Sequence, residues 1–310
     1  MKLKIVVIAF LMSTLMFGQE AQMQSVNLNV NEHVDGTLLF QDNSEQQPLA
    51  IIIAGSGPTD RDGNQNFMQS NALKKLATAL GQNGIATFRY DKRIVKQIRK
   101  NNVDPNLMFD DFITDAISVL SFFRNDERFN SIYIIGHSQG SLVGMLAANE
   151  GADGFISLAG AGKTIDKVII DQVEKTAPMF TEDTKRVFSV LAEGKTTEDF
   201  PPALISIFNL NIQAFMSNWM SYDPAKEISK LDMPILLING TKDLQVVEAE
   251  AELLKAANTN AQLEIIKDMN HILVPIAGDD LENSKSYNES YRTLSEELIE
   301  KIVTFIKENS

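Results

Sequence analysis

Short apolar runs alternate with longer segments in which apolar residues recur at helical spacing. Uninterrupted runs of this kind are typical of strands buried on both faces of a sheet, and the recurring spacing is typical of amphipathic helices. The predicted strands are residues 48–54, 85–90, 132–135, 154–158, 234–239 and 263–266. The predicted helices include residues 72–80, 109–123 and about 290–307. Because parallel neighbours need crossover connections, this alternation predicts an α/β fold with a mostly parallel central sheet flanked by helices.

Two stretches depart from this alternation. Residues 26–30 alternate valine or leucine with asparagine, and Asp35-Gly36 follows them, which predicts an antiparallel hairpin. From residue 163 to about residue 222 the apolar spacing predicts helices alone. A chain of 310 residues can therefore form one large α/β domain that carries a helical insertion.

The predicted strand 132–135 is joined to a following helix by the pattern G-x-S-x-G, with Ser138 at its centre. In a nucleophile elbow of this type the serine adopts a strained conformation on a sharp turn, and its hydroxyl stands clear of the sheet. The backbone N–H of Gln139 and the start of the helix dipole then point at any oxyanion formed there. The alternative interpretation is an ordinary tight turn in which the serine caps the helix.

Two further segments carry a resemblance to a known family. They are I-A-G-S-G-P-T-D-R-D-G-N at residues 53–64 and R-Y-D-K-R at residues 89–93. Together with the G-x-S-x-G turn, they resemble bacterial esterases and serine-aminopeptidase-like members of the α/β-hydrolase fold serine hydrolases. The resemblance extends from about residue 26 to the C-terminus, with a poorly matched middle.

This resemblance implies a division of the chain and a second oxyanion donor. The α/β-hydrolase core would comprise residues 20–162 and 223–310, and residues 163–222 would form a helical cap over the active site. In the family, the loop after the strand at 48–54 supplies a backbone N–H to the oxyanion hole. We assign this donor to Gly57, beside the N–H of Gln139.

The rest of a catalytic triad can be sought among few residues. A serine hydroxyl needs a base to take its proton, and the base needs an orienting acid. Of the three histidines, His137 lies beside the serine in the turn and His33 lies upstream, which leaves His271 as the base. Asp243 follows a predicted strand on the edge where catalytic groups of α/β sheets gather, and Ser138, Asp243, His271 is the order of this fold. The competing acids are Asp223, Asp232 and Asp268.

Other residues near the predicted site have two interpretations each. The charged residues 60–62 could orient substrate, but we predict first that they hold their loop by ion pairs with residues 89–93. Several apolar residues of the insertion could line an acyl pocket, or could seal the insertion onto the core. These are Phe208, Phe215, Met216, Trp219 and Met220.

The N-terminus resembles a signal for export. Lys2 and Lys4 precede an apolar run at residues 5–17, which predicts a signal peptide over about residues 1–19. An uncleaved anchor and a first buried strand are the alternatives. The chain contains no cysteine, so a lipid anchor on cysteine and disulfides are both excluded. We therefore expect an exported protein, periplasmic or extracellular, with no membrane span after cleavage.

Composition and chemistry together favour a hydrolase of small molecules. The net charge of −13 argues against a nucleic-acid surface, and no metal or organic cofactor is implied. We predict a serine hydrolase that cleaves carboxylic esters through an acyl-enzyme. The alternatives are a serine aminopeptidase, with Glu174, Glu193 or Asp199 holding the substrate amine, and a non-catalytic binding protein of the same fold. No oligomeric state is predicted.

Overall fold

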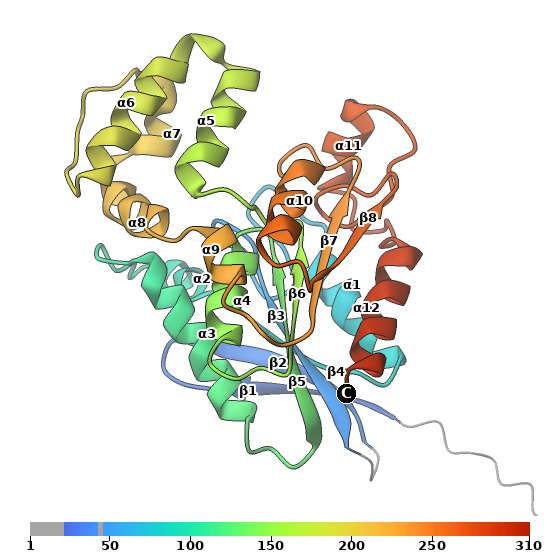
Figure 1. The fold of residues 1–310 in the computed structure, drawn as a ribbon. Helices are drawn as coiled ribbons and strands as arrows, with labels where there is room; N and C mark the ends of the chain where they lie inside the picture. Colours follow the sequence, from blue (N-terminus) through green and yellow to red (C-terminus); the bar gives the residue numbers. More distant parts are fainter. Residues whose placement is uncertain (1–21, 43–45) are drawn as a thin grey trace, which may run out of the picture.

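The computed structural model describes residues 22–42 and 46–310, and Figure 1 shows their fold. The predicted signal peptide at residues 1–19 lies outside the described residues. Within the described residues, eight strands form one sheet in the order β1-β2-β4-β3-β5-β6-β7-β8. The strands are β1 (Met23–Asn29), β2 (Asp35–Gln41), β3 (Gln47–Ile53), β4 (Ala86–Tyr90), β5 (Phe129–His137), β6 (Gly154–Leu158), β7 (Ile235–Gly240) and β8 (Gln262–Ile266).

The pairing of the strands agrees with the predicted sheet. β1 and β2 form the expected antiparallel hairpin, but Asp35 and Gly36 begin β2, and the turn lies at residues 30–34, where Val30 N–H donates to the Val34 carbonyl oxygen. β2 also pairs antiparallel with β4. The pairs from β4 through β3, β5, β6 and β7 to β8 are all parallel. The carboxyl ends of these strands therefore meet at one edge of the sheet, where the loops can bring distant residues together.

Helices cover both faces of the sheet (Figure 1). On one face, α1 and α12 pack on side chains such as Ala50 and Ile52, and on the other, α3, α4, α9 and α10 pack on Leu49, Ile51 and Ile53. Alternate residues of β3 thus supply two separate hydrophobic cores. The helices of this part are α1 (Ala72–Gln82), α2 (Arg93–Arg99), α3 (Phe109–Phe123), α4 (Gln139–Ala148), α9 (Pro224–Ile228), α10 (Glu248–Ala257), α11 (Asp280–Ser286) and α12 (Glu296–Glu308).

The helix boundaries differ from the sequence-based expectation in two respects. The final helix begins at Glu296 and not near residue 290, because the Ser295 side chain accepts a hydrogen bond from Leu298 N–H and so caps the helix there. The helices α2, α9, α10 and α11 were not predicted. α2, α9 and α11 are seven residues long or shorter, so their sequences show little helical periodicity, and α10 was overlooked between two strands.

The segment between β6 and β7 is helical, as predicted. It contains α5 (Ile165–Thr176), α6 (Thr181–Ala192), α7 (Ile205–Phe208) and α8 (Leu210–Met220), with short 3₁₀ turns at Pro178–Phe180 and Pro202–Leu204. These helices form a lobe at the upper left of Figure 1 and enclose a small core of their own. The lobe is held to α3, because Trp219 stacks on Phe109 at 5.4 Å and Tyr222 OH donates to Asp110 Oδ1 at 2.6 Å.

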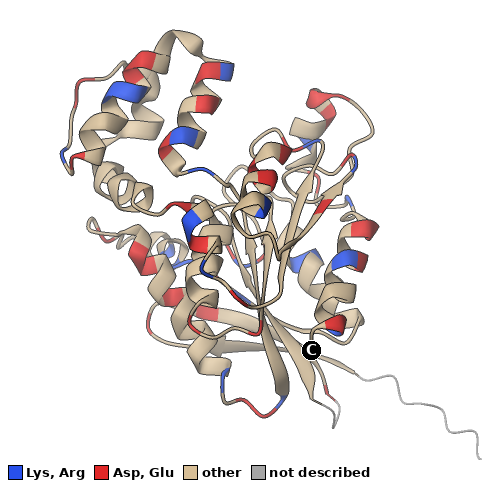
Figure 2. Cartoon of the chain, in the orientation of Figure 1, with Lys and Arg blue, Asp and Glu red and all other residues tan. Residues whose placement is uncertain are grey.

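Charged side chains lie mainly on the helices and loops, and the central strands carry almost none (Figure 2). Acidic and basic residues are interspersed over these elements, the acidic ones being more numerous in the sequence as a whole. Among the described residues, no helix combines the length and the apolar character needed to cross a bilayer.

Candidate active site

Ser138 lies on the turn between β5 and α4, and its backbone is strained. Its φ of 54° and ψ of −122° fall in a region that residues with a side chain rarely adopt. Such a conformation costs on the order of 1–3 kcal/mol and is concentrated at functional sites. The Ser138 side chain makes no capping hydrogen bond to α4. The geometry is therefore that of a nucleophile elbow and not that of a helix-capping serine.

The glycines of the motif are needed because backbone segments crowd together at this turn. A Cβ at Gly136 would overlap the backbone of Gly140, and a Cβ at Gly140 would overlap the carbonyl oxygens at the end of β3. At the neighbouring strand end, a Cβ on Gly55 would lie 3.2 Å from Ser138 Cβ. The absence of these side chains lets the loop after β3 approach Ser138 closely.

His271 and Asp243 form a buried pair on the loops that follow β8 and β7. His271 Nδ1 lies 2.7 Å from Asp243 Oδ2. The other carboxylate oxygen accepts hydrogen bonds from the N–H groups of Gln245 and Val246, at 2.8 and 2.9 Å. These bonds fix the carboxylate, which in turn favours the imidazole tautomer that carries its proton on Nδ1. The Nε2 atom is then left to act as a base.

The three competing aspartates have other surroundings. Asp223 caps α9 by accepting from Ala225 N–H at 3.2 Å, and Asp232 is exposed. Asp268 lies in the turn after β8 with a φ of 59°, and its N–H donates to Thr241 Oγ1. Among the described residues, none of the three bonds to His271, whereas Asp243 does.

Asn270 holds the loop of His271 and was not predicted from the sequence as a site residue. Its side chain is buried and accepts from Val274 N–H at 3.0 Å. Its amide donates to Asn283 Oδ1 and Ser286 Oγ, each at 2.9 Å. In the sequence, a polar residue next to the candidate base was only a weak indication of this role. The residues that its amide binds lie on α11, a helix that was not predicted.

Ser138 and His271 line the same small cavity, of about 60 Å³. In the described residues, His271 bonds to Asp243 but makes no hydrogen bond to the Ser138 hydroxyl. Catalytic hydrogen bonds often tighten only when substrate binds, so this geometry is compatible with a serine–histidine pair. The tertiary structure thus brings the three predicted triad residues to one edge of the sheet.

The loop after β3 presents two residues near the candidate oxyanion position. Ser56 lines the cavity shared by Ser138 and His271, and also the two neighbouring cavities. Gly57 has a φ of 74° and lines one neighbouring cavity together with Gln139. Gln65 and Thr59 brace this loop, since each donates to the Ser56 carbonyl oxygen. Ser56 N–H is therefore a further candidate donor beside the predicted Gly57 N–H.

Two larger cavities adjoin the small one. One, of about 240 Å³, is lined by Ser138, Gln139 and residues of α5. The other, of about 660 Å³, is mostly apolar and lies between α8 and the segment from α2 to α3. Its walls include Phe215, Met216 and Trp219 from the predicted acyl-pocket set. Phe208 and Met220, by contrast, pack in the core of the helical lobe.

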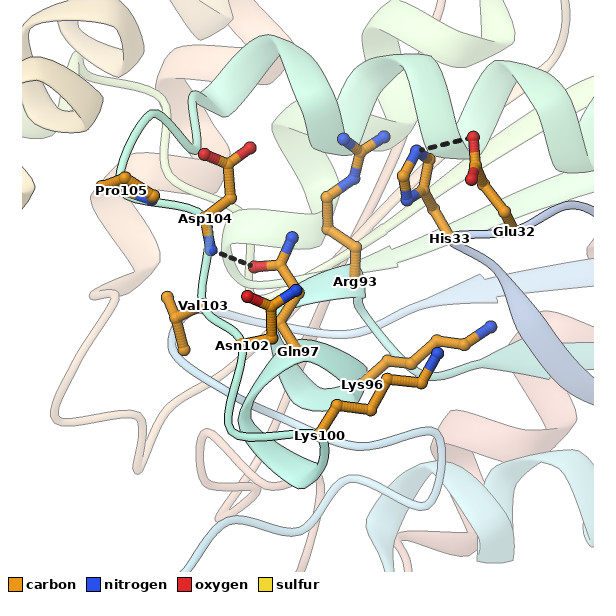
Figure 3. A pocket seen from close by; sticks show the side chains of 10 residues that line it. All are labelled: Glu32, His33, Arg93, Lys96, Gln97, Lys100, Asn102, Val103, Asp104 and Pro105. Carbon is orange, nitrogen blue, oxygen red and sulfur yellow. Dashed lines mark hydrogen bonds and ion pairs between the residues drawn. The ribbon is translucent and has the colours of Figure 1, made fainter.

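His33 lies in a separate groove, shown in Figure 3. The groove is lined mainly by polar residues of α2 and the loop after it. Two of its cations are paired, because Arg93 binds Asp115 and Asp111, and Lys96 binds Asp35. Neither Ser138 nor Asp243 lines this groove, so His33 is not positioned to act with them.

The charged loop at residues 60–62 is held by ion pairs, as predicted. Arg61 Nη2 lies 2.6 Å from Asp35 Oδ2 and 2.9 Å from Asp91 Oδ2, and Arg89 Nε lies 3.0 Å from Asp62 Oδ1. These bonds join the β1–β2 hairpin, the loop after β3 and the end of β4. The motifs at residues 53–64 and 89–93 are thus parts of one structural unit.

His137 ties the elbow to the loop of the candidate base. Its Nε2 lies 2.8 Å from the His271 carbonyl oxygen, so the ring donates from Nε2. Burial lowers the pKa of His137 to about 4, with the neighbouring His271 contributing in the same direction. The side chain therefore stays neutral in the folded protein at pH values where an ordinary histidine is protonated.

We expect this histidine to make the protein less stable in mild acid. The unfolded chain takes up a proton at about pH 6.5 and the folded chain does not, so stability is complete above that pH and falls toward pH 4. The loss should reach at most about 3 kcal/mol. Urea unfolding across pH 4–7 should show a smaller pH dependence in His137→Gln than in the wild-type protein. If the stability of the two proteins changed equally with pH, the assignment of this pH dependence to His137 would be wrong.

The fold and the site together define a class of protein. The strand order, the strained serine after β5 and the Asp–His pair on the loops after β7 and β8 are features of the α/β-hydrolase fold. Est1E from Butyrivibrio proteoclasticus superimposes with a TM-score of 0.56 at 15% identity, over 92% of this chain and 98% of that one. The Pyrococcus furiosus esterase Pf2001 gives 0.55 at 14% identity, over 93% and 91%. The chain has the predicted α/β-hydrolase fold.

Sequence comparisons identify similar proteins more specifically than the fold does. A family model described as serine aminopeptidase, S33, matches residues 67–198, which include the elbow. Esterase EstD from Thermotoga maritima is 27% identical over 247 residues, covering 77% of this chain and 58% of that esterase. The chain thus spans somewhat more than half the length of this relative. The predicted resemblance to esterases and serine-aminopeptidase-like proteins is confirmed.

Proposed function

We propose that the protein is a serine hydrolase that cleaves carboxylic esters through a Ser138–His271–Asp243 triad and an acyl-enzyme. The observation that carries this proposal is the strained Ser138, which faces the same cavity as a buried histidine already bonded to an aspartate. The names of the similar proteins, several of them esterases, support the same reaction class.

In the first half of the reaction, His271 Nε2 takes the proton of the Ser138 hydroxyl as its oxygen attacks the ester carbonyl. Asp243 holds the ring and stabilises its positive charge. The tetrahedral intermediate collapses when His271 returns the proton to the leaving alcohol, and the acyl group stays on Ser138. Water then repeats these steps, releasing the carboxylic acid and restoring the serine.

The developing oxyanion needs hydrogen-bond donors on the side opposite His271. We assign the N–H groups of Gln139 and Gly57 to this task, with Ser56 N–H as a further donor in the same loop. Gln139 begins α4, so the helix dipole adds to the attraction for negative charge. Each donor of this kind contributes a few kcal/mol to transition-state stabilisation.

The sizes and linings of the cavities suggest where the acyl group and the leaving group of the ester bind. The leaving group must lie beside His271, which protonates it, and the cavity that His271 lines measures about 60 Å³. The cavity of about 660 Å³ is lined by Gln139 and Gly57 but by neither His271 nor Ser138, and it shares Ser56 and Gln139 with the cavity of about 240 Å³ that Ser138 lines. We therefore place the acyl group in the large apolar cavity and propose that medium-length or aryl acyl groups are preferred over acetyl.

This placement predicts the result of filling the large cavity. Ile212 of α8 lines it, and Ile212→Trp should lower kcat/KM for nitrophenyl octanoate about 10-fold relative to nitrophenyl acetate. Leu210→Trp is the matched control, because Leu210 lies on the same helix, is 44% exposed and does not line the cavity. An equal loss for both esters in Ile212→Trp would place the acyl group elsewhere.

A serine aminopeptidase is the second candidate, because the matching family model carries that description. Such an enzyme needs an acidic side chain near the serine to hold a free amine. Glu174, Glu193 and Asp199 line none of the three cavities described above, and Asp199 pairs with Arg186. The deciding experiment compares nitrophenyl esters with aminoacyl anilides. Faster cleavage of the anilides would overturn the ester assignment.

A non-catalytic binding protein is the third candidate. A fluorophosphonate probe separates it from the other two, since the probe reacts only with an activated serine. Labelling should occur at Ser138 by mass spectrometry. Absence of labelling on the folded protein would favour the binding role.

We also propose that the protein is exported and that residues 163–222 act as a cap. The basic-then-apolar N-terminus supports export, and the position of the α8 side chains at the large cavity supports a cap. Fractionation of expressing cells should place a shortened chain outside the cytoplasm. A chain that stays in the cytoplasm at full length would contradict export.

A further inference from the structure

Lys92 is a buried amine between the two segments that carry the candidate oxyanion donors. Its side chain reaches inward from the end of β4, and the residue is only 5% exposed. The Nζ atom donates to the Gly55 carbonyl oxygen at 2.9 Å and to Gln139 Oε1 at 2.6 Å. One amine thus joins the loop after β3 to the first residue of α4.

The position of Lys92 is fixed from both sides along the chain. Asp91 is bound by Arg61 and Arg99, and Arg93 is bound by Asp111 and Asp115. The Nζ atom also lies 4.3 Å from the centre of the Phe112 ring. These contacts leave the buried stem little freedom, so the amine is held at a set distance from both acceptors.

Both acceptors of Lys92 are neutral, and burial lowers its pKa to about 7. The side chain is therefore present in both protonation states near neutral pH. An amine has two N–H donors and an ammonium has three. The two hydrogen bonds to Gly55 and Gln139 can accordingly be made in either state.

The two acceptors are close to the atoms that would bind the oxyanion. Gly55 lies in the same loop as Ser56 and Gly57, and Gln139 supplies its own backbone N–H. A tetrahedral oxyanion is bound well only when its donors are held at fixed mutual distances before the reaction. Among the residues that the structure describes, Lys92 is the only side chain with hydrogen bonds to both of these segments.

We propose that Lys92 is a positioning residue, which sets the separation of the two halves of the oxyanion hole by bonding to the Gly55 carbonyl and the Gln139 side chain. The inference rests on the proposed ester hydrolysis. Lys92 acts through its neighbours and does not touch the reacting atoms. Its loss should therefore weaken binding of the transition state more than binding of the substrate.

The first test is Lys92→Met, which removes the amine and keeps an unbranched side chain only one atom shorter. We expect kcat on a nitrophenyl ester to fall about 10- to 100-fold, with KM changed by less than about threefold. Affinity for phenylboronic acid, which forms a tetrahedral adduct on the serine, should fall in parallel with kcat/KM.

Lys75→Met is the control, because Lys75 is a partly buried lysine whose Nζ also donates to a backbone carbonyl, that of Arg292. This control should stay within about twofold of wild type.

A second variant keeps the test informative if Lys92→Met does not fold. Gln139→Met retains the backbone N–H but removes the acceptor for Lys92, so kcat should again fall, by about 3- to 30-fold, with little change in KM. If the two residues act as a unit, the double variant should lie within about threefold of Lys92→Met.

The outcomes separate the two proposals. An inactive wild-type protein would refute the ester hydrolysis itself. An active wild-type protein with unchanged kcat and boronate affinity in Lys92→Met would refute the positioning role alone. The positioning role would also be refuted if the fold-losses of kcat in the two single variants multiplied in the double variant. It would be refuted as well if Lys75→Met lost as much kcat as Lys92→Met.

Discussion

Ser138→Ala is expected to lower kcat/KM on a nitrophenyl ester by about 10⁴- to 10⁶-fold, among the largest effects expected of a single substitution in this protein. The variant loses the oxygen that forms the acyl-enzyme. The other hydroxyls that line the small cavity with His271 are those of Ser56, Thr59, Ser70 and Tyr287, and none of them lies on the strained turn after β5. A slow residual rate from the oxyanion donors alone is compatible with this loss.

The measurement requires a control for the fold, because Ser138 occupies a strained turn. Ser141→Ala is suitable, since Ser141 lies one helical turn away in α4 and its buried hydroxyl bonds to Ser157 Oγ at 2.7 Å. We expect Ser141→Ala to keep activity within about 10-fold of wild type and to lose some thermal stability. If Ser138→Ala retained its rate and fluorophosphonate labelling, the nucleophile would have to be Ser56 or Ser141.

Asp243→Asn should lower kcat by about 10⁴-fold while leaving the fold intact. The asparagine oxygen can keep the hydrogen bonds from Gln245 and Val246, so its NH₂ group would face His271 Nδ1. A donor in that place favours the tautomer with its proton on Nε2, and that nitrogen can no longer accept the serine proton. The loss should therefore appear in kcat and in labelling by fluorophosphonate, with KM little changed.

Asp268→Asn is the matched control for this prediction. Asp268 precedes His271 by three positions in the same loop, and in the described residues its side chain does not bond to the ring. Its activity should remain within about threefold of wild type. If Asp268→Asn lost more activity than Asp243→Asn, the acid of the triad would have been assigned to the wrong residue.

Much of the fold followed from local patterns. Buried apolar runs identified the central strands, because a strand covered on both faces is apolar at every position and is easily recognised in the sequence. The hairpin was predicted from its alternation, but its turn was placed at Asp35-Gly36, which begin β2, and not at residues 30–34. The helices α2, α9, α10 and α11 were missed and α12 was placed too early, because short helices and caps depend on contacts with the rest of the chain.

The candidate site was predicted in part. Ser138 could be located because its turn requires glycines at two fixed neighbouring positions, which is a local constraint written in the sequence. Asp243 and His271 could be proposed from chain order and strand ends. Their bond, and the exclusion of Asp223 and Asp268, needed the loops after β7 and β8 to be placed side by side.

The sequence by itself determined the alternation of strands and helices, the elbow and the short set of residues able to complete its chemistry. Tertiary structure alone decided which acid meets the histidine, that Ser56 lines the same cavity as Ser138 and His271, and that Lys92 bridges Gly55 and Gln139. The physical reason is the range of the interactions. Periodicity and turn chemistry act within a few residues, whereas these contacts join segments tens of residues apart that meet only when the parallel sheet has formed.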